Sequence, residues 1–560
     1  MARHVVWQTI LALLGIVLVF IILTQLVPEV IIEEIPAPGG TYIEGILGYS
    51  KAINPILAPS LVRANPVDQD LCALVFDGLT TLDETGQVTT SLAVDWDVSE
   101  DGKVYLFSLR PGVTWQDGVP FTAYDVLFTV QAMQDPNYQG DAGLHELWRT
   151  VTAERVDDYT VRFTLAEPFP SFLQYTTIGL LPAHLLSNVP AADLPRHDFS
   201  KQQPVGTGMF RVETVLPDRV VLVANPNYWG PRPYLERLEF RFFDNKEDLL
   251  LAYERGEIQG FHPDRSQPLV DLTRFPDLQL YSAQSAGYGL VYLNLTRETV
   301  PFFKVKEVRQ ALLYALDRPA LIDRVLAGQG LVADSPILPI TWAYDPSVRR
   351  YLYDPERAIG LLDASGWQDS DADRIRDREG VSLRFSLLTG DDPLMVQMAE
   401  EIARQWLAVG VEAQVRPVGS SRLPDLIRRR DFDAVLIEIG LAADPDPYPL
   451  WHSTQAGESG QNFSGWANEQ ADLVMEEGRS TPDPRQRTAL YHSFQQIFAE
   501  EVPSLLLYYP IYTYAVDAQV RQVQLPPLLR TSDRFRNIRD WYIETSEVVI
   551  RETAGFDKTP

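Results

Sequence analysis

A short loop rich in carboxylates and aromatic rings carries the side chains best suited to holding a ligand. Residues 443–452 read ADPDPYPLWH and directly follow a predicted strand at residues 434–439. In α/β proteins, ligands collect at the carboxyl ends of strands, where loops face a cleft. We therefore expect carboxylates for polar contacts and rings for apolar walls at this point. The candidates are Asp444, Asp446, Tyr448 and Trp451. The structural alternatives are a helix cap for either aspartate and core packing for Trp451.

A second predicted strand offers three more candidates on one face. Successive side chains of a strand point to opposite faces, so Tyr288, Tyr292 and Asn294 lie together and are expected to face the cleft. Tyr49 and Asn54, near an earlier strand, are weaker candidates.

The chain lacks the residue spacings of common catalytic and zinc sites. Its 7 histidines are scattered, with no HExxH pair and no cysteine–histidine zinc spacing. No G-x-S-x-G elbow occurs, and the GTG at residues 206–208 lacks the lysine of a phosphate loop. We therefore expect neither an enzyme nor a cofactor, and an extracytoplasmic hydrolase is the less favoured alternative.

One acidic run has part of a calcium-loop pattern. It places carboxylates at positions one, three, five and nine: Asp369, Asp371, Asp373 and Asp377. Arg374 replaces the usual glycine, and Gly380 replaces the bidentate glutamate at position twelve. A polar turn before a strand at residues 381–388 explains the run about as well. No metal is therefore expected, and calcium is kept as the weaker alternative.

The composition describes a large, folded and acidic protein. A chain of 560 residues exceeds one ordinary core, so two or more domains are expected. Hydrophobic residues make up 45% and aromatic residues 11%, which excludes disorder. The formal charge of −28 repels nucleic-acid phosphates, so we expect no nucleic-acid partner. Cys72 is the only cysteine, which rules out an intrachain disulfide.

The N-terminal segment is apolar enough to predict membrane attachment. Val5 to Val27 contains no charged residue, and as a helix it would extend about 35 Å, more than the roughly 30 Å hydrocarbon core. No small-x-small cleavage site follows it, and no lipoprotein cysteine ends it. Residues 1–28 are therefore predicted to be an uncleaved signal anchor, a single-pass transmembrane helix with Arg3 on the cytoplasmic side. The acidic, proline- and glycine-rich residues 29–40 are predicted to be a tether.

Strand-like runs alternate with amphipathic helices along the rest of the chain. Runs rich in β-branched and aromatic residues predict strands at residues 219–224, 238–243, 383–388 and 432–439. Helical spacing of apolar residues predicts helices at residues 306–316, 355–362 and 395–407. Length and alternation together favour two α/β lobes around a cleft.

The block at residues 96–126 is the most specific signature in the chain. It reads WDVSEDGKVYLFSLRPGVTWQDGVPFTAYDV: a hairpin, then a helix that Thr122 and Asp125 begin as a capping box. This block resembles the signature of the extracellular solute-binding proteins of family 5, which belong to peptide-type ABC importers. Further matches follow in order over roughly residues 40–515: FDGLT at 76–80, PVGTG at 204–208, NPNYW at 225–229, YERGEI at 253–258, VRQAL at 308–312, ALDR at 315–318 and DPE to GW at 354–367.

The resemblance implies a type II periplasmic-binding-protein fold of α/β class, with an extra subdomain inserted in the first lobe. The implied boundaries are 41–284 for lobe I with its subdomain at about 66–195, 285–505 for lobe II, and 506–560 for a return to lobe I and a C-terminal tail. Two strands then cross between the lobes, near residues 288–294 and 505–512, as hinges for closure around a ligand.

The resemblance also implies a function. Family members are extracytoplasmic receptors that capture a peptide-like solute between the lobes and deliver it to an ABC permease, while separate ATPase subunits supply the energy. Members that take peptides present an aspartate of the loop to the ligand's amino terminus, a role that falls on Asp444 or Asp446. A carboxylate shielded from water pairs strongly with an ammonium group.

The resemblance leaves the ligand and the use of the receptor open. Nickel complexes, haem and oligosaccharides are also ligands within the family. We expect a monomer in the periplasm or at the cell surface, and a ligand-occupancy sensor on the same fold is the main alternative function.

Overall fold

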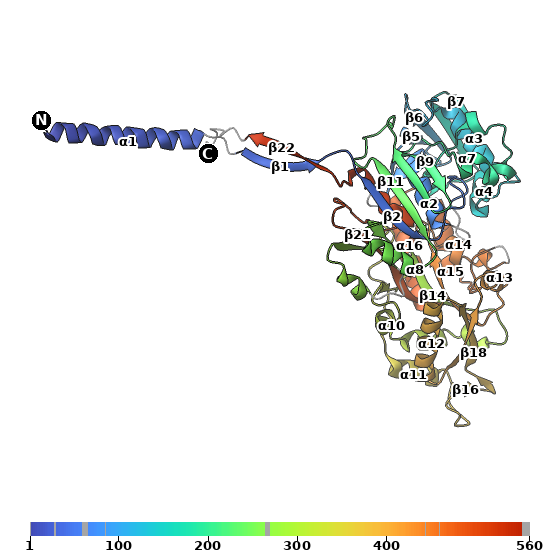
Figure 1. Ribbon diagram of the computed structural model, residues 1–560. Helices are drawn as coiled ribbons and strands as arrows, with labels where there is room; N and C mark the ends of the chain where they lie inside the picture. Colours follow the sequence, from blue (N-terminus) through green and yellow to red (C-terminus); the bar gives the residue numbers. More distant parts are fainter. Residues whose placement is uncertain are drawn as a thin grey trace.

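The computed structural model describes residues 2–26, 30–58, 65–83, 86–263, 269–442, 444–457 and 460–551 of the chain. A two-lobed body, mixed in helices and strands, carries a long N-terminal helix on a narrow two-stranded ribbon (Figure 1). The α/β class and the two lobes agree with the sequence-based expectation.

The apolar N-terminal run is helical. It forms α1 (Ala2–Leu26), which lies apart from the body (Figure 1). Among the helices of the described chain, none is both long enough and apolar enough to cross a membrane. The side chains of residues 1–6 and 20–33, at the two ends of the predicted membrane segment, lie outside the described part. Membrane attachment therefore stays a sequence-based prediction.

Part of the predicted tether is one strand of a ribbon. β1 (Val30–Pro36) pairs antiparallel with β22 (Thr545–Arg551), with Val30 opposite Arg551 and Pro36 opposite Thr545. Both strands contain runs of β-branched residues, VII and VVI, which favour extended pairing. The tether prediction rested on local composition, and it missed a partner strand at the other end of the chain.

One twelve-stranded sheet runs through both lobes in the order β19-β18-β20-β14-β21-β12-β2-β11-β10-β9, with β13 and β15 also paired to β21. The strands of lobe I are β2 (Thr41–Leu47), β9 (Phe210–Leu216), β10 (Arg219–Ala224), β11 (Arg237–Phe243), β12 (Gly260–Phe261) and β13 (Leu278–Gln284). Those of lobe II are β14 (Gly287–Leu293), β15 (Gly330–Val332), β18 (Arg384–Gly390), β19 (Glu412–Val418) and β20 (Ala434–Gly440). The predicted strands in these regions end within two residues of the observed ones.

A single long strand, β21 (Ser504–Asp517), joins the two lobes. Its first part pairs with β14 of lobe II, and its last part pairs with β13 of lobe I. The chain crosses a second time at residues 285–286, between β13 and β14. The crossing expected near residues 505–512 falls inside β21. The other expected crossing segment, 288–294, is displaced, because β14 is paired on both edges within lobe II by β20 and β21.

The subdomain of lobe I is built on an antiparallel sheet in the order β5-β6-β8-β7. Its strands are β5 (Ala93–Val98), β6 (Val104–Leu109), β7 (Val151–Asp157) and β8 (Thr160–Leu165), and its main helices are α3 (Ala123–Gln134) and α4 (Ala142–Arg149). The preceding helix, α2 (Pro66–Val75), packs against β9 of the large sheet. The predicted capping box is present: Thr122 accepts from the backbone of α3, and the Asp125 carboxylate accepts from the Thr122 N–H at 2.9 Å. Gly102 takes the left-handed conformation, φ +68°, that the hairpin turn requires.

Helices cover both faces of the lobe II sheet. They are α9 (Lys306–Tyr314), α10 (Arg318–Val325), α11 (Pro355–Ala364), α12 (Pro393–Leu407), α13 (Leu423–Arg428), α14 (Tyr448–Trp451), α15 (Glu469–Ser480) and α16 (Pro484–Glu501). Asp354, Asp392 and Asp483 each accept backbone N–H groups at a helix start where proline is the first residue. The predicted helices begin and end within two residues of α9, α11 and α12.

Candidate functional site

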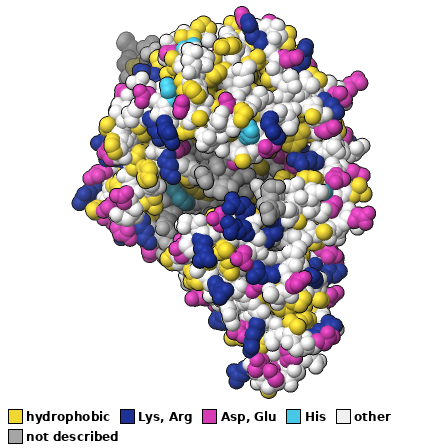
Figure 2. Space-filling view, turned by 90° about the vertical axis from the view of Figure 1, so that its right-hand side faces the viewer, with side chains coloured by type: hydrophobic (Ala, Val, Ile, Leu, Met, Phe, Trp, Pro, Cys, Tyr) yellow, Lys and Arg dark blue, Asp and Glu magenta, His cyan; other side chains and the backbone are white. Residues whose placement is uncertain are grey.

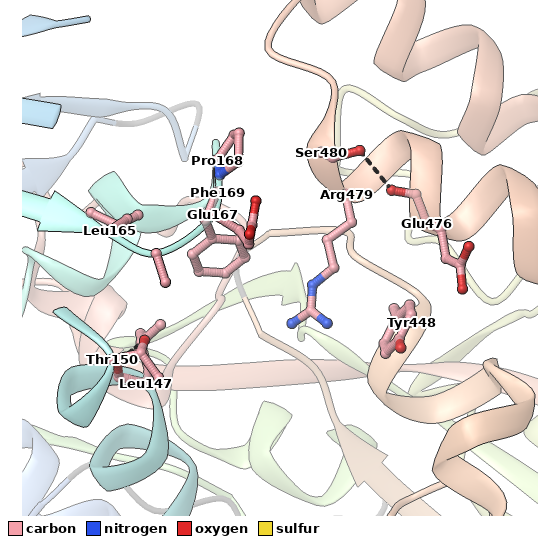
Figure 3. A pocket seen from close by; sticks show the side chains of 11 residues that line it. Leu147, Thr150, Leu165, Glu167, Pro168, Phe169, Tyr448, Glu476, Arg479 and Ser480 are labelled. Carbon is pink, nitrogen blue, oxygen red and sulfur yellow. Dashed lines mark hydrogen bonds between the residues drawn. The ribbon is translucent and has the colours of Figure 1, made fainter. Parts of the chain in front are cut away.

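A cavity of about 420 Å³ lies between the subdomain of lobe I and the helices of lobe II (Figure 3). Its volume is within the range of small-molecule sites. The subdomain contributes Leu147, Thr150, Leu165, Ala166, Glu167, Pro168 and Phe169, and lobe II contributes Tyr448, Glu476, Arg479 and Ser480. Lys and Arg side chains gather on the face of the molecule where its broad upper part meets its tapered lower part (Figure 2). The lobe interface is therefore where a ligand finds space.

The acidic loop follows β20 and leads directly into α14, which brings Tyr448 to the cavity. Asp446 shapes this turn, because its Oδ1 accepts a hydrogen bond of 3.0 Å from the backbone N–H of Tyr448. The N-cap residue of α14 is Pro447, so this contact of Asp446 belongs to the loop before the helix. Ala443, at the start of the loop, lies outside the described residues.

Asp444 is held by an arginine from a neighbouring helix. Arg487 of α16 donates from Nη2 to Oδ1 at 2.6 Å and from Nη1 to Oδ2 at 3.0 Å. Both side chains are buried, with 8% and 7% of their surface exposed. Burial opposes the charge on Arg487, but the adjacent Asp444 carboxylate outweighs it and raises the guanidinium pKa. Before any ligand binds, Asp444 is therefore already held in a bidentate ion pair with Arg487.

Asp446 has an arginine partner as well. Nε of Arg479, on α15, lies 3.2 Å from Oδ2 of Asp446. Burial raises the pKa of Asp446, Arg479 lowers it, and the nearby Asp444 raises it again. The Arg479 guanidinium lies 4.6 Å from the ring centre of Tyr448 and 5.6 Å from that of Phe169. Figure 3 shows it between these two rings, with its outer edge toward the cavity.

Both arginines also reach across the lobe interface. Nη2 of Arg487 donates a 3.0 Å hydrogen bond to the Ser171 hydroxyl, and Arg479 lies over the ring of Phe169. Ser171 and Phe169 belong to the subdomain segment before α5 (Phe172–Tyr175). The lobes therefore meet around the cavity, as they do in the closed state of a two-lobed binding protein.

Several predicted binding residues lie in the core instead. Trp451 is 1% exposed and packs on Phe498 and Tyr292, with ring centres 4.7 and 5.7 Å away, so the structure places it in the core. Tyr288 and Tyr292 are fully buried. Strand alternation gave no cleft-facing side here, because every residue of β14 is covered on both faces.

Three further candidates also lie away from the cavity. The amide of Asn294 donates to the backbone carbonyls of Arg430 and Phe432, a structural role. Tyr49 is 59% exposed on the surface, and Asn54 is buried with its amide donating to Ser200. Of the predicted residues, the structure brings together Asp444, Asp446 and Tyr448.

Three of the four carboxylates in the partial calcium pattern lie close together in the structure. Carboxylate oxygens of Asp369, Asp371 and Asp373 lie within 4.8 Å of one another, all exposed. The carboxylate of Asp377 instead accepts from the hydroxyl and backbone N–H of Ser370. The other carboxylates serve the turn: Asp369, Asp371 and Asp373 each accept a backbone N–H within the run. The polar-turn alternative accounts for these contacts.

Local patterns did not reveal the two arginines, Arg479 and Arg487, or the subdomain residues Phe169 and Ser171. The arginines lie on α15 and α16, which come later in the sequence than the acidic loop. No recognisable residue spacing connects them with Asp444 or Asp446. One signal was present: two buried carboxylates in one loop require compensating cations. The arginines of the next two helices, Arg479 and Arg487, were the candidates for these cations.

Comparison with known proteins agrees with the geometry. Residues 87–461 match the model of the bacterial extracellular solute-binding proteins, family 5. The oligopeptide-binding protein AppA of Bacillus subtilis is 30% identical over 91% of this chain and 92% of its own. The structure of that protein in complex with a nonapeptide covers 91% of this chain and all of its own, with 28% identity and a TM-score of 0.73.

A second solved structure extends the likeness to a different ligand. NikZ from Campylobacter jejuni in complex with Ni(L-His) is 26% identical, covers 90% of this chain and 99% of its own, and has a TM-score of 0.73. The predicted family is thereby confirmed. With its two lobes, the cavity between them and a family match over more than half its length, the chain belongs to the bacterial extracellular solute-binding proteins of family 5.

Proposed function

We propose that the protein is the extracytoplasmic receptor of an ABC importer, and that it captures a peptide-like solute in the interlobe cavity and delivers it to the permease. The observation that carries this proposal is the cavity of about 420 Å³ lined by residues of both lobes. The printed names of relatives support the ligand class, since one is an oligopeptide-binding protein and its structure holds a nonapeptide.

The fold supplies the motion that such a receptor needs. In the described part of the chain, two segments pass between the lobes, β21 and residues 285–286, and they can bend while each lobe stays rigid. A ligand that touches both lobes favours the closed state by its contacts with the second lobe. The receptor then acts as a monomer without a cofactor, and ATP is hydrolysed by other subunits of the importer.

Membrane attachment through the first helix completes the proposal. It is supported by the uncharged run from Val5 to Val27 and by the lack of a cleavage site after it. The body is then held outside the membrane, in the periplasm or at the cell surface.

The proposal is tested by identifying what the protein carries. The full-length protein is purified from its native host in detergent and denatured, and the released molecules are identified by mass spectrometry. We expect short peptides in amounts comparable to the protein. Recovery of a nickel complex, haem or an oligosaccharide would retain the receptor but replace its ligand. Gene neighbours that encode a permease and ATPases would separate import from ligand sensing.

A further inference from the structure

We infer that residues 525–530, in the C-terminal part of lobe I, act as a hinge strap that favours the closed arrangement of the lobes. The strap lies outside the cavity, so it regulates how firmly a solute is kept without touching the solute. The inference rests on the proposed capture between the lobes and adds a control on that capture.

The hinge strap is hydrogen-bonded to the chain where the chain crosses between the lobes. Leu528 donates its N–H to the carbonyl of Gln284 at 2.9 Å, and its own carbonyl accepts from the N–H of Ala286 at 2.7 Å. Ser285, between these two residues, forms a parallel bridge with Leu528. The backbone dihedrals of a crossing segment have to change when the lobes move. The strap therefore restrains a segment that must bend.

Two neighbouring leucines of the strap pack into different lobes. Leu528 is 1% exposed and belongs to the core of lobe I. Leu529 is half-buried and packs against the core cluster of lobe II that contains Tyr288 and Trp451. Because this contact removes apolar surface from water, it favours the arrangement in which lobe II stays against the strap.

The strap is fixed to lobe I by the residues that follow it. Oδ2 of Asp533 accepts the backbone N–H groups of Leu529 and Arg530, at 2.9 and 2.8 Å. Asp533 lies in η5 (Thr531–Phe535) beside Arg534, which donates to both carboxylate oxygens of Asp70 at 2.7 and 2.6 Å. Arg534 and Asp70 are each 3% exposed. A strap anchored this way can hold lobe II, whereas a loose loop would follow it.

The same hydrogen bonds extend to the acidic loop of the cavity. The carbonyl of Ala286 accepts from the N–H of Leu441 at 3.1 Å, while the N–H of Ala286 donates to Leu528. Leu441 comes directly after β20, at the start of the loop that brings Tyr448 to the cavity. One residue of the crossing is thus bonded to the strap and to the cavity loop, so the strap holds the hinge and this loop in register.

Paired spin labels can measure the separation of the lobes. The full-length protein in detergent carries Asp218→Cys on lobe I and Asp323→Cys on lobe II, both at exposed positions, and pulsed electron resonance gives the distance between the labels. Cys72 is buried and stays unlabelled. The labelled protein is compared with versions that also carry Leu529→Ala, Leu529→Met or Leu525→Ala. Leu525 is the matched control, because it packs against the core of lobe I.

Without a ligand, Leu529→Ala should lower the ratio of closed to open molecules by about 5- to 30-fold, because it removes much of the leucine contact with lobe II. Leu529→Met should keep most of the closed population, since it conserves the volume of the side chain. Leu525→Ala should keep the label distances of the wild type. Ala-Ala-Phe, titrated by calorimetry, should bind Leu529→Ala more weakly, by no more than the loss in closed population.

Label distances in Leu529→Ala that match those of the wild type would overturn the strap, and so would an equal shift in Leu525→Ala. Thermal unfolding curves show that each variant is folded. A wild type that does not bind Ala-Ala-Phe would contradict the proposed peptide ligand instead, and the distances measured without ligand would still decide whether the strap acts.

Discussion

The guanidinium of Arg487 in lobe II donates a 3.0 Å hydrogen bond to the hydroxyl of Ser171 in lobe I. Ser171 is 3% exposed, so the contact is shielded from water. Because the two residues belong to different lobes, the bond exists only while the lobes are closed. It therefore adds to the stability of the closed state, whether or not a ligand is bound.

Ser171→Ala removes this bond and leaves the pair between Arg487 and Asp444 intact. We expect the closed state to lose about 1 kcal/mol and the ligand to bind about fivefold more weakly. Small-angle scattering of the ligand-free variant should show a larger radius of gyration than the wild type. Ser493→Ala is the control, since that exposed hydroxyl donates to Ala489 within one helix. Unchanged affinity and unchanged scattering for Ser171→Ala would refute the interlobe role.

Asp444→Asn tests whether the buried pair stabilises the fold. The substitution leaves the Arg487 guanidinium buried without its counter-charge, so the free energy of unfolding should fall by about 3–5 kcal/mol. The exposed pair of Asp425 and Arg428 is the control, and Asp425→Asn should change stability by less than about 1 kcal/mol. Urea unfolding followed by tryptophan fluorescence measures both. Similar small losses for the two variants would mean that Asp444 is free to serve the ligand instead.

Acetylation of the ligand's amino terminus should matter little. Both loop aspartates already have arginine partners, so we expect Ala-Ala-Phe and N-acetyl-Ala-Ala-Phe to bind within about threefold of each other. Calorimetric titration of the two peptides into the wild type is the measurement. An affinity loss beyond about 30-fold on acetylation would restore the sequence-based expectation that Asp444 or Asp446 receives an ammonium group.

Asp77 gives the fold a pH dependence. Burial raises its pKa to about 6, although Trp229, whose Nε1 donates at 2.9 Å, and Thr207 lower it. The unfolded chain loses the Asp77 proton near pH 4, before the folded chain does, so the contribution of this group to stability falls as pH rises from about 4 to about 6.

Asp77→Asn removes that titration. We expect the variant to gain stability relative to the wild type as pH rises across this window, by on the order of 3 kcal/mol in total. Urea unfolding at pH 4.5, 5.5 and 7.5 compares the two proteins. A stability difference that stays constant over the three pH values would show that Asp77 is ionised in the folded state throughout.

The first helix is expected to stay on the mature protein. Because no cleavage site follows Val27, N-terminal sequencing should find Met1 or Ala2, and the protein should sediment with membranes. A mature sequence that begins beyond Pro28 would contradict this prediction.

Local chemistry allowed the sequence to predict many elements. Thr122 with Asp125, and the aspartate–proline pairs that begin α11, α12 and α16, specify helix starts through contacts within a few residues. The family motifs have a structural cause too: Asp77 of FDGLT and Trp229 of NPNYW bind each other in lobe I. A motif that builds the scaffold identifies the family without touching the ligand.

Distant pairings set the limit of that prediction. Alternation along β14 indicated a cleft-facing side, but β20, β21 and the packed helices cover the strand, so Tyr288 and Tyr292 became core residues. Arg479 and Arg487 joined the site through the packing of α15 and α16, which no spacing near Asp444 encodes. The sequence therefore identified the acidic loop, but it did not show that arginines neutralise both of its aspartates.

The pairing of β1 with β22 fixes how far the body stands from the first helix. Seven paired residues, at about 3.4 Å each, make a stem about 24 Å long. A doubled strand bends less than a single chain, so the stem limits the volume that the body explores (Figure 1). When the body explores a smaller volume, its effective concentration rises for any partner that lies at the same distance from the first helix. Deleting β22 would therefore slow delivery without touching the cavity.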